Sequence, residues 1–239
     1  MAYADWDINK LGGSNFHGGN QGTARRHIYL ENPLTGYGDY CRQYILTSGS
    51  ASTLLYYTLK ETLEDGLFFE IPSSKTISMR ASLRYSNFAG NNTAIGITAK
   101  FDPSFISLST TSPKGYTVML GDTTETSTGG NIKIVCDNKS GAHSTTVTSI
   151  SVAADEWERI RMDVTSVSAT EDLIEIYTGT GDSGEEVWTL IESKTVLDSD
   201  SFWIPWAESG SGKVGFFVLS SNSTRSVFID NFEIYVGDV

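Results

Sequence analysis

Alternating apolar and polar residues recur along most of this chain, and such a period of two predicts β-strands. The alternation is cleanest in residues 75–86, where the apolar positions are Ile77, Met79, Ala81 and Leu83. Clusters of Gly, Asp, Asn or Pro separate this run from its neighbours and mark turns. Further strands are predicted over residues 67–72, 93–101, 115–120, 131–136, 147–152, 157–167, 172–179 and 185–193. This spacing is typical of a meandering antiparallel sheet, and about a dozen strands are expected in all.

The strand predicted over residues 157–167 has one apolar face and one charged face. Ile160, Met162 and Val164 are expected to point inward, and the charged side chains between positions 159 and 163 outward. The next two strands, over 172–179 and 185–193, are expected to form a hairpin across the glycine-rich turn that separates them.

Two strand-like runs lie near the end of the chain, in residues 212–236, and flank the polar turn 220–225. They are predicted to pair as a β-hairpin that closes a sandwich. The main apolar residues of the second run share one parity and are expected on one face of the strand. They are Phe228, Phe232, Ile234 and Val236.

The first 45 residues differ from the rest, because they contain many glycines and aromatic residues but no regular alternation. We therefore expect an irregular N-terminal arm in residues 1–45 and a β-sandwich domain in residues 46–239. Such an arm buries little surface by itself and is expected to become ordered on a partner. Residues 51–63 are ambiguous, since their leucines fit a helical spacing whereas Thr and Tyr favour a strand, and the strand is preferred.

The composition supports an all-β class. Of the 239 residues, 39% are hydrophobic and 19% are charged, and Gly, Ser and Thr are abundant, as in strands joined by many turns. A chain of this length can hold one large sandwich with a single core. The predicted fold is therefore a two-sheet antiparallel jelly-roll sandwich.

The net charge of −12 disfavours nucleic acid and anionic membranes as partners. Arg25, Arg26 and His27 form a compact basic group, which is too small to change this expectation. No apolar run approaches the roughly 18 residues of a membrane-spanning helix. The N-terminus has no basic region followed by an apolar one, so secretion by a signal peptide is not expected.

No metal or cofactor is predicted. The three histidines are scattered, so neither a zinc site nor a Ser/His nucleophile is supported. Cys41 and Cys136 are far apart in sequence and match neither a disulfide framework nor a metal-site spacing. Both cysteines are expected to be free thiols.

Five segments resemble the C-terminal half of concanavalin A-like lectin and glucanase jelly rolls, which include laminin-G-like domains. They are residues 157–164, 172–177, 188–190, 212–218 and 227–235. The resemblance covers at most residues 65–239, and its motifs are signatures of a fold. It implies two curved antiparallel sheets, of which the concave one often holds a glycan. The short chain with its glycine-rich arm is also similar to bacteriophage virion proteins that decorate heads or tails.

The glucanases of this superfamily carry a strand motif Glu-x-Asp-x-x-Glu, which places a nucleophile and an acid on one face of a strand. This chain has Glu171, Asp172 and Glu175 in the corresponding type of strand. Glu171 and Asp172 are adjacent and face opposite ways, so the spacing does not match. The chain is therefore predicted not to be an enzyme, with no catalytic residues.

Recognition is expected to depend on aromatic side chains in loops. Trp203 and Trp206 lie on either side of a stiffening proline, where two indoles can form a stacking platform for a sugar or an anchor for a protein. The alternative is that both indoles plug one end of the sandwich. Trp157 and Trp188, within predicted strands, are expected in the core. The candidate binding residues are Trp203, Trp206, Tyr37, Tyr40, Arg25 and Arg26.

Three functions are compatible with these features. The favoured one is a structural protein of a virus particle, a capsid cement or tail-associated protein that contacts other virion proteins and copies of itself. It would be made in the host cytoplasm and located in the virion. The alternative is a lectin-like module that binds a glycan, for example on a host. The third is a glucanase, which the spacing of the acidic residues disfavours.

Overall fold

A computed structural model gives the architecture of the chain, and its described part contains 14 strands. The described residues are 2–4, 23–29, 40–46, 51–58, 75–86, 93–100, 115–122, 130–137, 143–152, 156–181, 186–204, 213–220 and 225–238. No helix occurs among them, and so none of the described residues forms a helix that would cross a membrane. The predicted all-β class is confirmed.

The strands form two antiparallel sheets. Sheet A contains β1 (Ala2–Ala4), β2 (Thr23–Tyr29), β3 (Tyr40–Leu46), β5 (Lys75–Ser86), β10 (Glu158–Ser168), β11 (Glu171–Thr180), β12 (Val187–Leu197) and β14 (Arg225–Asp238). Sheet B contains β4 (Ala51–Thr58), β6 (Thr93–Ala99), β7 (Gly115–Asp122), β8 (Gly130–Asp137), β9 (His143–Val152) and β13 (Lys213–Ser220). The strand between 51 and 58 settles the ambiguity in that segment, whereas the strand predicted over 67–72 lies outside the described residues.

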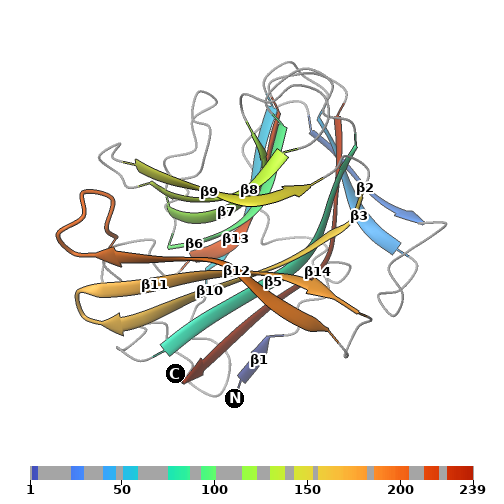
Figure 1. Ribbon diagram of the computed structural model, residues 1–239. Helices are drawn as coiled ribbons and strands as arrows, with labels where there is room; N and C mark the ends of the chain where they lie inside the picture. Colours follow the sequence, from blue (N-terminus) through green and yellow to red (C-terminus); the bar gives the residue numbers. More distant parts are fainter. Residues whose placement is uncertain are drawn as a thin grey trace.

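The order of strands is β12-β11-β10-β5-β14-β3-β2 in sheet A, with β1 also paired to β14, and β4-β13-β6-β7-β8-β9 in sheet B. Figure 1 shows the sheets as stacked layers, with β5, β10, β11 and β12 below β7, β8 and β9. Strands β6 to β9 form the predicted meander, and β11 and β12 form the predicted hairpin. The two-sheet jelly-roll sandwich is thus the observed fold.

The hydrophobic core fills the space between the sheets, and strand alternation decides which residues enter it. In β5 the predicted inward residues 77, 79, 81 and 83 are all buried, and Ile160, Met162 and Val164 of β10 are fully buried opposite them. Sheet B contributes the inward residues of β6, β7 and β8. Cys136 is one of these, and its thiol is buried and not part of a disulfide. The Cys41 side chain lies outside the described residues, so the prediction for the two cysteines together stays a prediction.

The predicted C-terminal hairpin is wrong. Strand β13 pairs with β4 and β6 in sheet B, whereas β14 pairs with β5, β3 and β1 in sheet A. The polar segment between them therefore leads from one sheet to the other. Both strands are long and apolar because both are interior to their sheets, and the local pattern did not distinguish this arrangement from a hairpin.

The apolar residues of β14 share one parity in the sequence, but that parity does not place Phe228 and Ile234 opposite residues of one face of β5. A register shift lies between Asp230 and Glu233, so that Phe228 pairs with Arg84 whereas Ile234 pairs with Met79. Met79 belongs to the core. Arg84 lies five positions further along β5, and residues an odd number of positions apart on a strand point to opposite faces. A β-bulge of this kind changes the face presented by the residues that follow it.

The described parts of the N-terminal segment form β1, β2 and most of β3, which all belong to sheet A. The absence of regular alternation meant that these strands were not predicted. Most residues of 1–45 lie outside the described part, so the proposed boundary at residue 45 and the ordering of an arm on a partner stay predictions.

Candidate functional site

The face of sheet A that points away from sheet B, here called the outer face, carries one continuous row of side chains across four strands. Arg80 of β5 lies opposite Arg161 of β10, Arg161 opposite Tyr177 of β11, and Tyr177 opposite Leu190 of β12. Leu190 is 49% exposed, and Arg80, Arg161 and Tyr177 are half-buried. The outer face at this row is thus an accessible surface that combines apolar, aromatic and cationic groups.

Arg161 is held in a fixed orientation by its neighbours. Its Nε donates to Oδ1 of Asp163 at 2.9 Å and its Nη2 donates to Oδ2, which makes a bidentate ion pair. The guanidinium carbon lies 4.6 Å from the centroid of the Tyr177 ring. The hydrogen bonds to Asp163 raise the pKa of Arg161, so this residue is always charged. Arg161 and the Tyr177 ring therefore form one rigid unit.

Tyr177 remains a protonated hydrogen-bond donor. Partial burial, together with the neighbouring Glu175 carboxylate, raises the pKa of Tyr177. Asp163 and Glu175 lie directly opposite each other in the next row of the outer face. Asp163 is thus paired with Arg161 of the row, and the Glu175 carboxylate lies close enough to Tyr177 to influence its pKa.

Trp188 extends the same surface toward the end of the β11–β12 hairpin. It lies opposite Gly179, and a Cβ at Gly179 would come within 2.8 Å of the indole. Trp188 is half-buried and does not belong to the core cluster, so the prediction of a core side chain is wrong. Trp157 is also half-buried outside that cluster and packs on Phe228, with ring centroids 6.5 Å apart. Glycine in mid-strand here permits the close approach of an indole.

Replacing Gly179 with Ala is expected to move the Trp188 indole and lower the free energy of unfolding by about 1 kcal/mol, since the new methyl group overlaps the ring. Urea denaturation measures the change. In a Trp188→Ala background the same Gly179 substitution should have no such cost, and the neighbouring exposed Thr180→Ala should change stability by less than about 0.5 kcal/mol. An equal loss in both backgrounds would show that the indole is not the cause.

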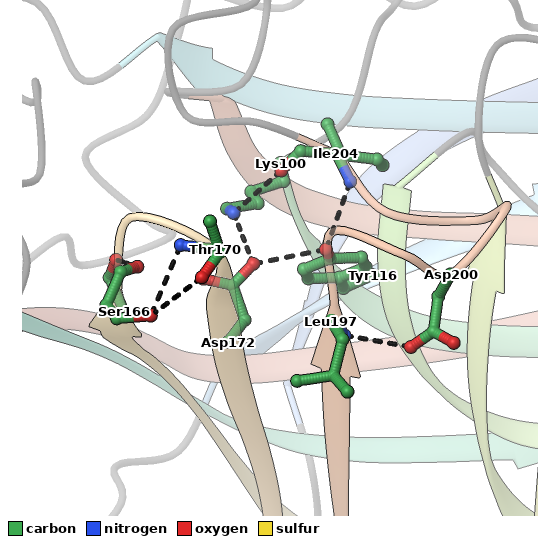
Figure 2. Close-up of polar contacts among 9 residues, drawn as sticks. Lys100, Tyr116, Ser166, Thr170, Asp172, Leu197, Asp200 and Ile204 are labelled. Atoms are coloured by element: carbon green, nitrogen blue, oxygen red, sulfur yellow. Dashed lines mark hydrogen bonds and ion pairs between the residues drawn. The ribbon is translucent and has the colours of Figure 1, made fainter.

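A second polar cluster lies inside the sandwich, between the sheets (Figure 2). Lys100 follows β6, and its Nζ donates to Oδ2 of Asp172 in β11 and, at 2.8 Å, to the carbonyl of Ile204. The Tyr116 hydroxyl of β7 donates to the same Asp172 oxygen at 3.1 Å and accepts from the Ile204 amide at 3.2 Å. Lys100, Asp172 and Tyr116 are fully buried. The cluster joins both sheets to the segment 198–204.

Lys100 reaches this position because its backbone is left-handed, with φ of 51°. By strand alternation the residue after the buried Ala99 would point to the other face, and the left-handed residue breaks that alternation. Burial lowers the pKa of Lys100 to about 8, against the opposing effect of Asp172. Burial also raises the pKa of Tyr116 far above its usual range, so the phenol remains protonated.

Trp203 belongs to this interior cluster. Its indole lies over the Lys100 ammonium, with Nζ 4.7 Å from the ring centroid, and it packs against the hydrophobic core. It is half-buried. This position agrees with the alternative in which the indole closes one end of the sandwich. Trp206 and Tyr37 lie outside the described residues.

The remaining candidate residues lie in β2 and β3 at one edge of sheet A. Arg25 is opposite Tyr44, Arg26 opposite Gln43, and Tyr40 opposite Tyr29. Their side chains are outside the described part. Strand β12, which leads into Trp203, forms the other edge of the same sheet. Among the candidates that the structure describes, Arg25, Arg26 and Tyr40 therefore lie on strands at one edge of sheet A, and Trp203 follows the strand at the opposite edge. The grouping of all six candidates in one site stays a prediction.

The acidic residues compared with the glucanase motif separate as expected from alternation. Asp172 is fully buried and bonded to Lys100, whereas Glu175 lies on the outer face beside Tyr177. Among the described residues, no group of three or more His, Cys, Asp and Glu side chains could hold a metal ion. The sequence did not identify the row of Arg80, Arg161 and Tyr177 as a site, although a glycine at 179 within a strand was an available signal of close packing.

No protein-family model matches the chain, and no curated protein matches it by sequence. Solved structures do match its fold. The endo-β-1,4-glucuronan lyase of the fungus Trichoderma reesei is similar over 100% of this chain and 95% of its own, with 12% identity and a TM-score of 0.54. A protein of unknown function from Shewanella oneidensis MR-1 covers 97% of this chain and 85% of its own, with 13% identity and a TM-score of 0.50.

The legume lectin-like domain from Entamoeba histolytica is similar over 91% of this chain and 90% of its own, with 14% identity and a TM-score of 0.47. The similarity to the first two structures agrees with the two-sheet β-sandwich fold of this chain. At these identities the similarity concerns the fold, which hosts both enzymes and binding proteins.

Proposed function

We propose that the chain binds carbohydrate without catalysis, through the outer face of sheet A around Tyr177 and Trp188. The observation that carries the proposal is the arrangement of Arg161, Tyr177 and Trp188 as neighbours on an accessible face of β10, β11 and β12. Sugar rings stack their C–H faces on aromatic side chains and donate or accept hydrogen bonds at their edges. A surface that joins aromatic rings to pre-oriented polar groups suits such a ligand.

The rigidity of this surface supports the proposal. The Arg161 guanidinium lies over the Tyr177 ring, and the indole of Trp188 rests against Gly179. Ordered side chains lose little entropy when a ligand arrives. The exposed Leu190 beside Tyr177 adds apolar area.

The fold gives additional support of a more general kind. The Trichoderma reesei protein similar over the full chain is, by its name, a lyase of glucuronan, which is a polysaccharide. Since a fold does not fix a function, the proposal depends on the surface described above. The role in a virus particle, with its partners and location, stays a prediction from the sequence that the described residues do not support.

Carbohydrate binding is tested with an array of acidic and neutral polysaccharides, followed by calorimetry with the oligosaccharide that binds best. Tyr177→Ala and Trp188→Ala are each expected to weaken binding about 10-fold, because each removes an aromatic stacking partner worth about 1 kcal/mol or more. Thr195→Ala is the matched control on the exposed side of β12, and its affinity should equal that of the wild-type protein.

Two results would contradict the proposal. One is the absence of binding to every polysaccharide on the array. The other is binding that Tyr177→Ala and Trp188→Ala leave unchanged. In the second case a loss in Trp206→Ala would locate the site in the loop that the sequence predicted.

A further inference from the structure

The edge of sheet A that β12 forms carries most of the exposed apolar side chains of the described residues. No described strand pairs with the free side of β12, which therefore ends the sheet. Val187, Leu190 and Leu197 of this strand are three of the four large hydrophobic residues that are exposed in the described part of the chain. An exposed apolar edge strand presents unpaired backbone groups and is a template for pairing with another chain.

The open part of this edge is the first half of β12. Both faces of the strand are accessible there, because Leu190 is exposed on the outer face, and Val187 and Thr189 are exposed on the face toward sheet B. In the second half, Val196 is buried and Lys194 donates to two hydroxyl groups of β9, so sheet B covers that part of the edge. The start of β12 is therefore the part that a partner strand can reach.

The open part has the composition of a pairing strand. Residues 187–191 are uncharged and consist of β-branched, aromatic and aliphatic side chains, with Glu186 before them and Glu192 after them. Short uncharged segments of high β-propensity are the ones that associate by strand pairing. Glutamates at the two ends repel negative charge on a neighbouring chain and so restrict pairing to these five residues.

The five residues are complementary to themselves in one antiparallel register. With a two-fold axis at Thr189, this residue lies opposite its own copy, Trp188 lies opposite Leu190, and Val187 lies opposite Ile191. Trp188 and Leu190 share the outer face, since they lie opposite Gly179 and Tyr177 within the sheet. Each residue of the segment thereby gains an uncharged partner on its own face.

Neighbouring registers lack this complementarity. A slip of one residue places side chains of opposite faces together. A slip of two residues in one direction places Glu186 opposite Leu190, and in the other direction it places Glu192 opposite Trp188. The register centred on Thr189 is therefore selected over its neighbours.

The length of the segment sets the expected strength of the contact. Five residues of each chain pair, and interfaces that bury less than about 1,200 Å² in total belong to weak, transient complexes. Association is expected at protein concentrations on the order of 100 µM and dissociation at about 1 µM. A two-fold contact uses the same segment of both copies, so the assembly closes as a dimer.

We propose that two copies of the chain pair through residues 187–191 of β12 and join their A sheets into one continuous sheet across a two-fold axis at Thr189. The outer faces of the two copies then lie on the same side of the joined sheet. This inference goes beyond the proposed carbohydrate binding and does not rest on it.

Cross-linking by a new cysteine tests the register. Directly opposite residues of antiparallel strands have Cα atoms about 4.5–5.5 Å apart, within the range of about 4.4–6.8 Å that a disulfide spans. At about 100 µM under mild oxidation, Thr189→Cys is expected to form a disulfide-linked dimer at least about 10-fold faster than Thr195→Cys. Thr195 is the matched control, because it is an exposed threonine of the same strand outside the pairing segment. Non-reducing electrophoresis measures both rates.

Sedimentation velocity from about 1 to 100 µM tests the dimer without a new disulfide. The wild-type protein should change from monomer to dimer over this range. Thr189→Lys places two lysines opposite each other in the dimer and should weaken association at least about 10-fold, whereas Thr195→Lys should leave it unchanged. Far-ultraviolet circular dichroism and urea unfolding verify that each variant is folded.

Three results would overturn the proposal. They are a monomeric wild-type protein at 100 µM, equal cross-linking of the two cysteine variants, and association that Thr189→Lys leaves unchanged. All these measurements are made without glycan. Failure of the dimer and failure of carbohydrate binding are therefore distinguished.

Discussion

Replacing Asp172 with Ala is expected to lower the free energy of unfolding by about 3–5 kcal/mol, because it leaves a buried lysine without its carboxylate. Asp172 has no exposed surface, and it accepts hydrogen bonds from Lys100 and Tyr116. The substitution also leaves the Tyr116 hydroxyl with one bond fewer. Urea denaturation measures the loss, and the variant should unfold at a much lower urea concentration with a similar slope.

The double substitution Lys100→Met with Asp172→Leu removes both charges of the buried ion pair. Comparing its free energy of unfolding with that of Asp172→Ala separates the cost of leaving one charge unpaired from the net contribution of the ion pair. Buried ion pairs replaced together by apolar groups are often neutral or stabilising, so the double variant should be more stable than either single one. Asp198→Ala, at an exposed position just after β12, serves as the control and should change stability by less than about 0.5 kcal/mol. A loss below 1 kcal/mol in Asp172→Ala would show that the cluster does not hold the sheets together.

The second large effect is a rise in stability with pH on the alkaline side. The pKa of Lys100 is lowered by burial from 10.5 to about 8, so between these values the unfolded chain holds a proton that the folded chain has released. The free energy of unfolding therefore increases with pH, by about 2 kcal/mol from pH 8 to pH 10. Below pH 8 both the folded and the unfolded chain hold this proton, so Lys100 no longer makes the free energy of unfolding depend on pH.

Tyr116 acts in the opposite direction at higher pH. Its pKa is raised by burial, so above about pH 10 the unfolded chain loses a phenolic proton that the folded chain keeps, and the stability falls. Urea unfolding at intervals from pH 7 to 11 should therefore show a maximum near pH 10. The Lys100→Met variant should lack the rise from pH 8 to 10. A wild-type protein with flat or falling stability over that range would contradict the assigned pKa of Lys100.

Much of the fold could be predicted from the sequence, because alternation is a local property. The inward residues of β5 and β10 were identified correctly, since each lies on a sheet with one face against the core. The pairing of distant strands could not be predicted in the same way. Strands β13 and β14 are neighbours in sequence and belong to different sheets, and the bulge after Asp230 changed the face of β14 without a signal in the local pattern.

The candidate site was less predictable for the same reason. Arg80 and Arg161 are on different strands far apart in sequence, and only the register of β5 with β10 places them side by side. Lys100 joins Asp172 and Ile204, which lie 72 and 104 positions away, and its inward direction depends on one left-handed residue. Trp203 was expected either in an exposed binding platform or at one end of the sandwich, and its position depends on the contact with Lys100 in this cluster. No local motif encodes such contacts.

The central claim is that the Tyr177 and Trp188 surface binds carbohydrate, and a polysaccharide array probed with the wild-type protein and the double variant Tyr177→Ala/Trp188→Ala tests it most directly. The wild-type protein is predicted to bind at least one class of glycan, and the folded double variant is predicted to lose at least the roughly 10-fold in affinity expected for each single variant. Failure of the wild-type protein to bind any glycan, or full retention of binding in the double variant, would contradict the account.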